Sequence, residues 1–317
     1  MEHFRSCILL GFGQTCNIKK TKSIQIGENG RMRKRRLWVG IILILGVILG
    51  SGVYIYRDHS ESYYYVLTPR KVKTGFFSTF NMVLGALDFC EKMHCRGLEV
   101  DFGEGGLYFE PQRGQNWWNY YFEPIRLGSM KKARICHFSS KEKRNLSLKA
   151  EFELPLERAR ELIDKYVHIK PEILEKVGQF EKTYFQGYSI LGVHYRGTDK
   201  VQEAPRVPYE EMEAQIERAA QEQVKEWKIF VATDDQLFLD FVKERWPGKV
   251  VAFDAIRSVD GKPIHLTNRD NYQKGEEAII DCLLLSRCNL LIKTASNLSD
   301  CSLQFNPSLP VVRVCLD

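Results

Sequence analysis

The chain has 317 residues, of which 44% are hydrophobic and 27% charged, so it is long enough for one large globular domain or two ordinary ones. Nine of its 46 basic residues but only two of its 40 acidic residues lie in residues 1–36, which leaves 37 basic and 38 acidic residues elsewhere. This near-neutral remainder lacks the basic face that binds phosphate backbones, so we predict no nucleic-acid partner.

Residues 37–56 contain no charged side chain, and twenty apolar residues suffice to cross a hydrocarbon core of roughly 30 Å. The basic run before them predicts a single-pass signal-anchor with a cytosolic tail, residues 1–36. The tail could equally start at Met32. A cleaved signal peptide is the alternative, although the apolar segment exceeds a typical signal core. The spacing Gly46–Gly50 is compatible with a homodimer. We therefore expect a membrane protein of the Golgi, if eukaryotic, or of the inner membrane, if bacterial.

Seven of the nine cysteines follow the apolar segment, and two of these, Cys90 and Cys95, lie five positions apart. No second pair completes a zinc pattern, which favours a buried or disulfide-bonded role for each cysteine over metal binding.

Residues 57–62 read as a short polar stalk, and residues 63–185 as a first α/β unit. Within this unit, residues 116–124 hold five aromatic side chains, which could form a packed core or a platform for a sugar ring. The hydropathy pattern predicts strands over 63–67 and 97–102, and helices over 75–93, 156–166 and 171–185.

Residues 186–317 alternate short apolar strands with helices, which is typical of a doubly wound parallel sheet. The predicted strands are 189–194, 229–233, 250–253, 290–294 and 311–315, and the predicted helices are 209–227, 236–246 and 275–286.

Polar side chains follow three of these strands. They begin at His194, Thr233 and Thr294. Because ligands of such sheets bind outside the carboxyl ends of the strands, we expect these three segments to form one crevice.

Arg196 followed by Gly197 suits a diphosphate, since the guanidinium can contact two oxygens and a glycine lets the backbone approach closely. Plainer roles exist for each candidate: a surface ion pair for Arg196, a helix N-cap for Asp235 and a solvated helical position for Asp281. The chain has no Walker, dinucleotide-binding or serine-hydrolase motif and no D-x-D motif at a strand end. Charge on a leaving group would then be stabilised by the protein itself.

The segment His194-Tyr195-Arg196-Gly197-Thr198-Asp199-Lys200 resembles the H-x-R-R-T-D-K signature of the core N-glycan fucosyltransferases. Residues 232–235 resemble their A-T-D-D block, and Asp281, with Leu285-Ser286 and residues 294–297, resembles their third block. The rhizobial nodulation fucosyltransferases and the protein O-fucosyltransferases are more distantly similar.

The resemblance implies a GT-B-like pair of Rossmann-like halves that transfers L-fucose from GDP-fucose to a glycan acceptor, with inversion and without a metal cofactor. It implies catalytic roles for Arg196, Lys200 and Glu203, with Arg196 on the β-phosphate and Glu203 as the base. It implies that His194 and Asp281 bind guanosine and that Ser296 and Asn297 bind the diphosphate. The further substrate-binding candidates are Asp199, Asp234, Asp235 and Thr294.

Three departures from the family pattern stand out. Gly197 replaces the second arginine, Glu203 requires a one-residue deletion in the loop, and Asn297 stands where the family commonly has serine. We therefore expect a membrane-anchored fucosyltransferase with an acceptor-side domain at 63–185 and a donor domain at 186–317. The alternatives are a catalytically degenerate anchored nucleotide-sugar or glycan-binding protein, and a transferase that uses another nucleotide-sugar.

Overall fold

The computed structural model describes residues 63–68, 75–104, 106–138, 154–197, 206–261 and 270–315, all within one compact unit of the chain. The tail, anchor and stalk predicted for residues 1–62 lie outside the described residues. In the part of the chain that is described, no helix combines the length and apolar character needed to cross a membrane.

The first sheet has four strands in the order β3-β2-β1-β4: β1 (Tyr63–Leu67), β2 (Gly97–Val100), β3 (Arg126–Gly128) and β4 (Arg134–Phe138). Strand β1 pairs in parallel with β2 and β4, whereas β3 pairs antiparallel with β2. Helix α2 (Phe76–Lys92) connects β1 to β2 and is largely buried, as expected for a crossover helix in a parallel sheet.

The aromatic segment of residues 116–124 forms part of the core. It includes the short 3₁₀ helix η2 (Trp117–Tyr120), which follows η1 (Pro111–Arg113). Trp117, Trp118, Tyr121 and Phe122 are each at most 2% exposed. Of the two roles left open for this segment, the packed core is therefore the one observed, because these rings present no free face to a sugar.

The second sheet has five strands, all parallel, in the order β7-β6-β5-β8-β9. They are β5 (Ser189–Tyr195), β6 (Trp227–Thr233), β7 (Val250–Val251), β8 (Leu290–Lys293) and β9 (Val311–Arg313). The chain starts at the centre, builds outward to β7, and then returns to build the other side from β8. This confirms the predicted doubly wound sheet.

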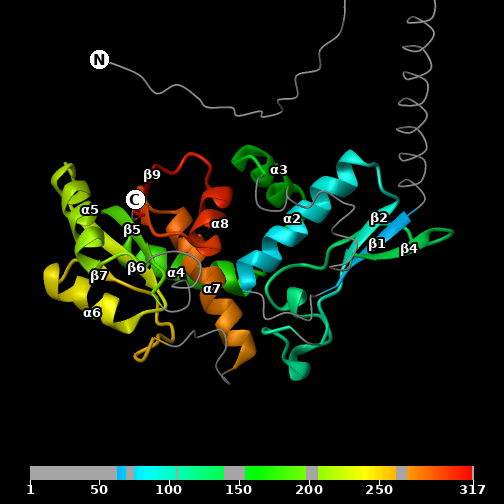
Figure 1. The fold of residues 1–317 in the computed structure, drawn as a ribbon, viewed down its shortest axis with the longest axis horizontal. Coiled ribbons are helices and arrows are strands. Elements are labelled where there is room, and N and C mark those ends of the chain that lie inside the picture. Colours follow the sequence, from blue (N-terminus) through cyan, green and yellow to red (C-terminus); the bar gives the residue numbers. More distant parts are fainter. Residues whose placement is uncertain are drawn as a thin grey trace, which may run out of the picture. The chain divides into compact units, whose positions relative to one another are not determined.

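Helices cover both faces of this sheet (Figure 1). Helices α5 (Tyr209–Gln221) and α6 (Gln236–Arg245) share one apolar cluster with one face of β5 and β6. Helix α7 (Asn271–Ser286) packs on the opposite face and against α8 (Asn297–Phe305). The alternation of β5 explains the arrangement, since Leu191 and Val193 face α5 and α6 while Ile190 belongs to the other cluster.

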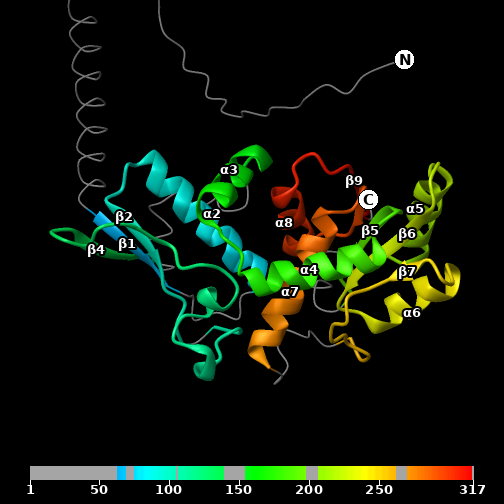
Figure 2. The same cartoon turned by 180° about the vertical axis from the view of Figure 1, so that it is seen from behind.

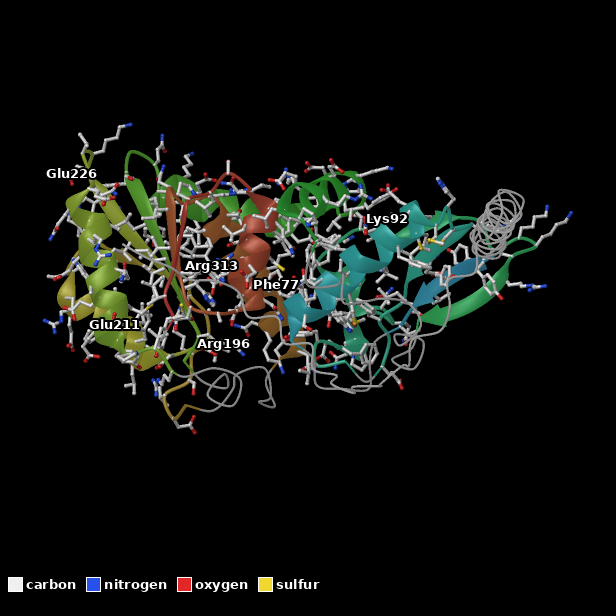
Figure 3. The ribbon with its side chains drawn as sticks, turned by 45° about the horizontal axis from the view of Figure 1, so that its top comes forward. Phe77, Lys92, Arg196, Glu211, Glu226 and Arg313 are labelled. Atoms are coloured by element: carbon white, nitrogen blue, oxygen red, sulfur yellow. The ribbon has the colours of Figure 1, made fainter. Side chains whose placement is uncertain are left out.

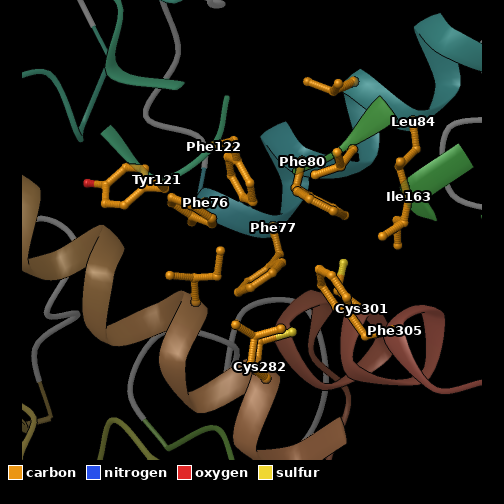
Figure 4. Close-up of a cluster of buried hydrophobic side chains, with 14 of the residues drawn as sticks. Phe76, Phe77, Phe80, Leu84, Tyr121, Phe122, Ile163, Cys282, Cys301 and Phe305 are labelled. Carbon is orange, nitrogen blue, oxygen red and sulfur yellow. The ribbon is translucent and has the colours of Figure 1, made fainter. Parts of the chain in front are cut away.

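Helices α3 (Leu156–Tyr166) and α4 (Pro171–Tyr184) contact α8 and α7 respectively, although both precede the predicted boundary at residue 186. Figure 2 shows α4 alongside α7. Phe77 of α2 also faces Cys282 of α7, and Phe80 of α2 lies against Phe305 of α8 (Figure 4). The two sheets therefore share one hydrophobic core.

Some predicted elements differ from the observed ones. Helix α5 ends at Gln221, six residues before the predicted end, because Trp227 already belongs to strand β6. Helix α8 was missed, since its buried face includes Ser299 and Ser302, small polar residues that blur the helical pattern of apolar positions.

Candidate functional site

The carboxyl ends of β5, β6 and β8 lie together at one edge of the second sheet. Tyr195 pairs with Thr233 at the end of β6, and His194 pairs with Lys293 at the end of β8. The strand order reverses between β5 and β8, so the connections leaving these two neighbours run to opposite faces. Such a switch point opens a crevice that binds ligands in doubly wound folds.

Arg196 is the first residue after β5 and lies at this switch point (Figure 3). Its backbone N–H donates to Oγ1 of Thr294 across the reversal, at 3.0 Å. Its Nε lies 3.2 Å from Oδ2 of Asp234, and the side chain is 24% exposed. Thr294 thus holds the backbone of Arg196 and Asp234 holds its guanidinium, which is still accessible to an anionic ligand.

Asp234 organises the turn that carries this arginine. Its Oδ1 accepts the backbone N–H of Gly197 at 2.9 Å, while Oδ2 faces Arg196. One carboxylate therefore fixes both the path of the backbone and the direction of the guanidinium. The Asp234 carboxylate orients Arg196, in addition to any contact with substrate that the sequence predicted for it.

Both carboxylate oxygens of Asp235 accept hydrogen bonds from within the protein. Its Oδ1 accepts from the backbone N–H of Leu237 and Phe238, which confirms the predicted N-cap of α6. Its Oδ2 accepts from Arg206 at 3.0 Å and from the Tyr209 hydroxyl at 2.7 Å. These bonds tie the start of α5 to the start of α6.

Asp235 leaves no room for a side chain at residue 197, which explains Gly197. A Cβ atom at Gly197 would lie 2.5 Å from Oδ2 and 2.7 Å from Cβ of Asp235. The sequence predicted that this glycine makes room for a phosphate, but the structure shows a cause within the protein: Asp235 already fills that space.

The β8 side contributes hydroxyl and amide groups at the start of α8. Ser296 caps this helix, its Oγ accepting from the Leu298 N–H, and Asn297 is the first helical residue. The first N–H groups of a helix and its macrodipole favour a nearby anion. Arg196 and the N-terminus of α8 therefore face the same switch point with complementary chemistry for a diphosphate.

His194 and Asp281 both belong to the α7 side of the sheet. Leu285 and Cys288 lie against Gly192, and α7 runs antiparallel to β5 because it leads into the parallel strand β8. Asp281, one turn before Leu285, is therefore displaced toward the carboxyl end of β5, where His194 is buried.

Asp281 is buried, which contradicts the alternative of a solvated helical residue. Burial, together with the negative charge of Glu277 and against the positive charge of Arg257, raises the pKa of Asp281 to about 7. Among the described residues, Oδ1 of Asp281 and Nε of Arg257 are buried without a hydrogen-bond partner. A buried acceptor beside a buried donor suits a ligand with a polar edge, such as a nucleobase.

Sequence reasoning missed Arg257 and Glu277 as neighbours of Asp281. Arg257 lies in an irregular segment after β7, where it donates to the carbonyls of Phe253 and Ala255. No motif or periodicity marks such a position. Arg206 and Tyr209 were missed because their partner, Asp235, is distant in sequence.

Three members of the predicted site, Asp199, Lys200 and Glu203, lie outside the described residues. Across the described ranges, no group of three or more His, Cys, Asp or Glu side chains could hold a metal ion.

The fold and this site define a doubly wound α/β protein with a cationic crevice at its switch point. The family model for Nodulation protein Z (NodZ) matches residues 152–314, about half of the chain. The chain therefore belongs to the NodZ family, which confirms the predicted membership of the fucosyltransferase superfamily.

Solved structures agree with this assignment at the level of fold. The fucosyltransferase NodZ from Bradyrhizobium is 18% identical with a TM-score of 0.53, and the match covers 79% of this chain and 95% of that one. A NodZ α-1,6-fucosyltransferase co-crystallised with GDP is 18% identical with a TM-score of 0.52, over 79% and 94% of the two chains. One soaked with GDP-fucose is 19% identical with a TM-score of 0.53, over the same fractions. No curated protein matches the sequence.

Proposed function

We propose that this NodZ-family chain is an inverting, metal-independent glycosyltransferase that transfers L-fucose from GDP-fucose to a glycan acceptor. The family membership and the shared fold support the reaction class. The observation that carries the proposal is the position of Arg196, held at the switch point by Asp234 and Thr294.

This geometry suits departure of a nucleoside diphosphate. As the bond between the sugar and the β-phosphate breaks, negative charge grows on the phosphate oxygens. A guanidinium already oriented by Asp234 needs no rearrangement to stabilise that charge, and the N-terminus of α8 at Ser296 and Asn297 adds backbone donors.

The remaining roles follow the family resemblance. His194 and Asp281 bind the guanosine, while Glu203 removes the proton from the acceptor hydroxyl as it attacks the sugar from the opposite face. Asp199 and Lys200 complete the donor site with Arg196. The donor domain spans residues 186–317 and the acceptor-side domain residues 63–185, with a single-pass anchor at 37–56.

The direct test is incubation of the purified full-length chain with GDP-fucose, GDP-mannose and UDP-sugars, with release of the nucleotide as the readout. Among these donors, we expect release of the nucleotide only from GDP-fucose. A glycan acceptor should increase this release. Release from a UDP-sugar instead would assign a different donor.

Gly197 favours a second candidate, a nucleotide-sugar-binding protein without transfer activity. The family's second arginine is replaced by a glycine whose side-chain space is occupied by Asp235. Calorimetry followed by chromatography of the recovered nucleotide distinguishes the two candidates: both should bind GDP-fucose, but a binder without catalysis would leave it intact over hours.

A further inference from the structure

Helix α2 ends in a motif that brings two cysteines together. The N–H of Cys95 donates to the carbonyl of Cys90 at 2.9 Å, and the N–H of His94 donates to the carbonyl of Glu91 at 3.3 Å. His94 has φ of +50°, in the left-handed region. These two bonds and the left-handed residue define a Schellman motif, in which Cys90 is the third residue from the helix end and Cys95 the second residue beyond the cap.

The Schellman motif places the side chains of these two positions in contact, a contact usually made by two apolar residues. In this chain both positions are cysteine. The Cys95 thiol lies beside the Cys90 thiol, and this neighbour together with burial raises the pKa of Cys90. Both residues are half-buried, so a small reagent can reach them.

The other described cysteines differ from this pair. Cys282, Cys288 and Cys301 are buried within the core, and Cys315 is exposed near the end of the chain. Among the cysteines whose side chains are described, Cys90 and Cys95 thus form the pair of neighbouring thiols that is also partly exposed.

We propose that Cys90 and Cys95 form a disulfide by exchange with a small-molecule disulfide such as oxidised glutathione. The thiolate of one cysteine attacks a glutathione sulfur, which forms a mixed disulfide and releases one glutathione thiolate. The thiolate of the second cysteine then attacks the protein sulfur of the mixed disulfide and releases the second. Two protein thiols become one disulfide, and one oxidised glutathione becomes two reduced molecules.

The backbone favours this bond, because the Schellman hydrogen bonds have already closed the loop. A non-glycine residue in the left-handed region costs about 1 kcal/mol, and a covalent link across His94 would hold the turn against that cost. The link would fasten the end of α2 to the start of β2, since Gly97 opens that strand. It does not depend on the proposed transfer reaction.

The test exposes the folded full-length protein to an excess of oxidised over reduced glutathione. Free thiols are then blocked with N-ethylmaleimide under denaturing, acidic conditions, and tryptic peptides are analysed by mass spectrometry. Trypsin separates the two cysteines, because it cleaves after Lys92 and Arg96. We expect peptides 74–92 and 93–96 to remain joined and to be lighter than the two reduced peptides by two hydrogen atoms.

Cys95→Ser should abolish the joined species and leave Cys90 open to the maleimide, whereas Cys288→Ser should leave it unchanged. The oxidised wild-type protein should also unfold a few degrees higher than the reduced one, and Cys95→Ser should lose this difference. Maleimide on both Cys90 and Cys95 after oxidation of the folded protein would overturn the proposal, as would a lasting glutathione adduct on either cysteine.

Discussion

Arg196 shows how much of the site could be predicted at the level of single residues. Its place after an apolar strand and before a glycine was enough to predict an anion-binding role. The sequence could not show that Asp234 would orient the guanidinium or that Asp235 would be consumed by Arg206 and Tyr209. These pairs of residues lie 26 to 38 positions apart in the chain. They meet only because β5 and β6 are neighbours in the sheet, and the sequence pattern of each strand alone does not show which strand lies beside it.

Replacing Arg196 with lysine should remove nearly all transfer. Lysine retains the positive charge but loses the planar guanidinium, whose Nε is held by Asp234. By analogy with removal of an oxyanion donor, we expect turnover to fall about 10²-fold or more, with a smaller loss of GDP affinity and an almost unchanged melting temperature. Arg245→Lys is the matched control, because its Nε also pairs with a carboxylate, Glu213, at 3.1 Å. Turnover close to wild type in Arg196→Lys would refute the role.

The raised pKa of Asp281 predicts that both the stability of the ligand-free fold and the affinity for GDP depend on pH. Its folded pKa, about 7, lies above the ordinary value of 3.8, so its burial destabilises the ligand-free fold increasingly as pH rises from about 4 to 7 and not further above that range. A ligand that donates hydrogen bonds to this carboxylate favours the ionised form. GDP affinity should therefore rise about tenfold between pH 6 and pH 8.

Asp281→Asn isolates this effect, since the phosphate of GDP also titrates near pH 6. The variant should bind GDP more weakly at pH 8 and lose the part of the pH dependence that belongs to the carboxylate. It should also be more stable than wild type at pH 8 without ligand. Identical GDP affinities by calorimetry at every pH would remove Asp281 from the binding site.

At the scale of elements, the sequence predicted the long amphipathic and strongly apolar segments well. Helix α3 and strand β1 have the predicted bounds, and α2, α4, β5 and α6 lie within two residues of them. The short strands β3 and β4 and the helix α8 were missed. Strand β3 is three residues long and lacks any buried position, so tertiary pairing with β2 determines its conformation.

The carboxylate of Glu91 joins α2 to α3, beside Asp88, which also pairs with Arg158. It accepts hydrogen bonds from Arg158, from Lys165 at 2.6 Å and from the Tyr166 hydroxyl at 2.6 Å. Burial acts to raise the pKa of Glu91, but these bonds outweigh it and lower the pKa to about 2. The resulting stabilisation is complete above about pH 4.5 and is lost as pH falls from there through 2.

Glu91→Gln should lower the free energy of unfolding at pH 7 by about 1–2 kcal/mol, a value reduced for partial solvent exposure. The difference from wild type should shrink below about pH 4. Urea denaturation at both pH values measures it. Glu161→Gln is the control, because Glu161 also pairs with Arg158 but is 67% exposed. An equal effect of the two substitutions would show that Glu91 has no special role.

At the scale of the whole molecule, the shared core predicts that the two sheets unfold together. Phe77 is 4% exposed and lies where α2 meets α7 and α8. Phe77→Ala should destabilise the protein by about 3–5 kcal/mol and lower a single melting transition, seen alike by far-UV circular dichroism and tryptophan fluorescence. Val224→Ala, at a 99% exposed position, should change nothing. Two separate transitions in the wild-type protein would contradict the shared core.

The proposed anchor is tested with a reporter at the C-terminus that is active only in the cytoplasm. The basic run before residues 37–56 predicts that the catalytic part lies across the membrane from the cytoplasm, so the reporter should be inactive. The same reporter placed before residue 37 should be active. An active C-terminal reporter would reverse the proposed topology.

The contact between Gly197 and Asp235 limits how this protein could change by mutation. A substitution at residue 197 that adds a side chain must displace the carboxylate that caps α6 and binds Arg206. The second arginine of the core N-glycan fucosyltransferase signature is therefore not accessible at this position by a single amino-acid change on this backbone. Libraries that vary residue 197 alone should return glycine, whereas recovery of arginine should require a simultaneous change at Asp235. Gly197 and Asp235 then behave as one unit, in which neither residue is free to vary without the other.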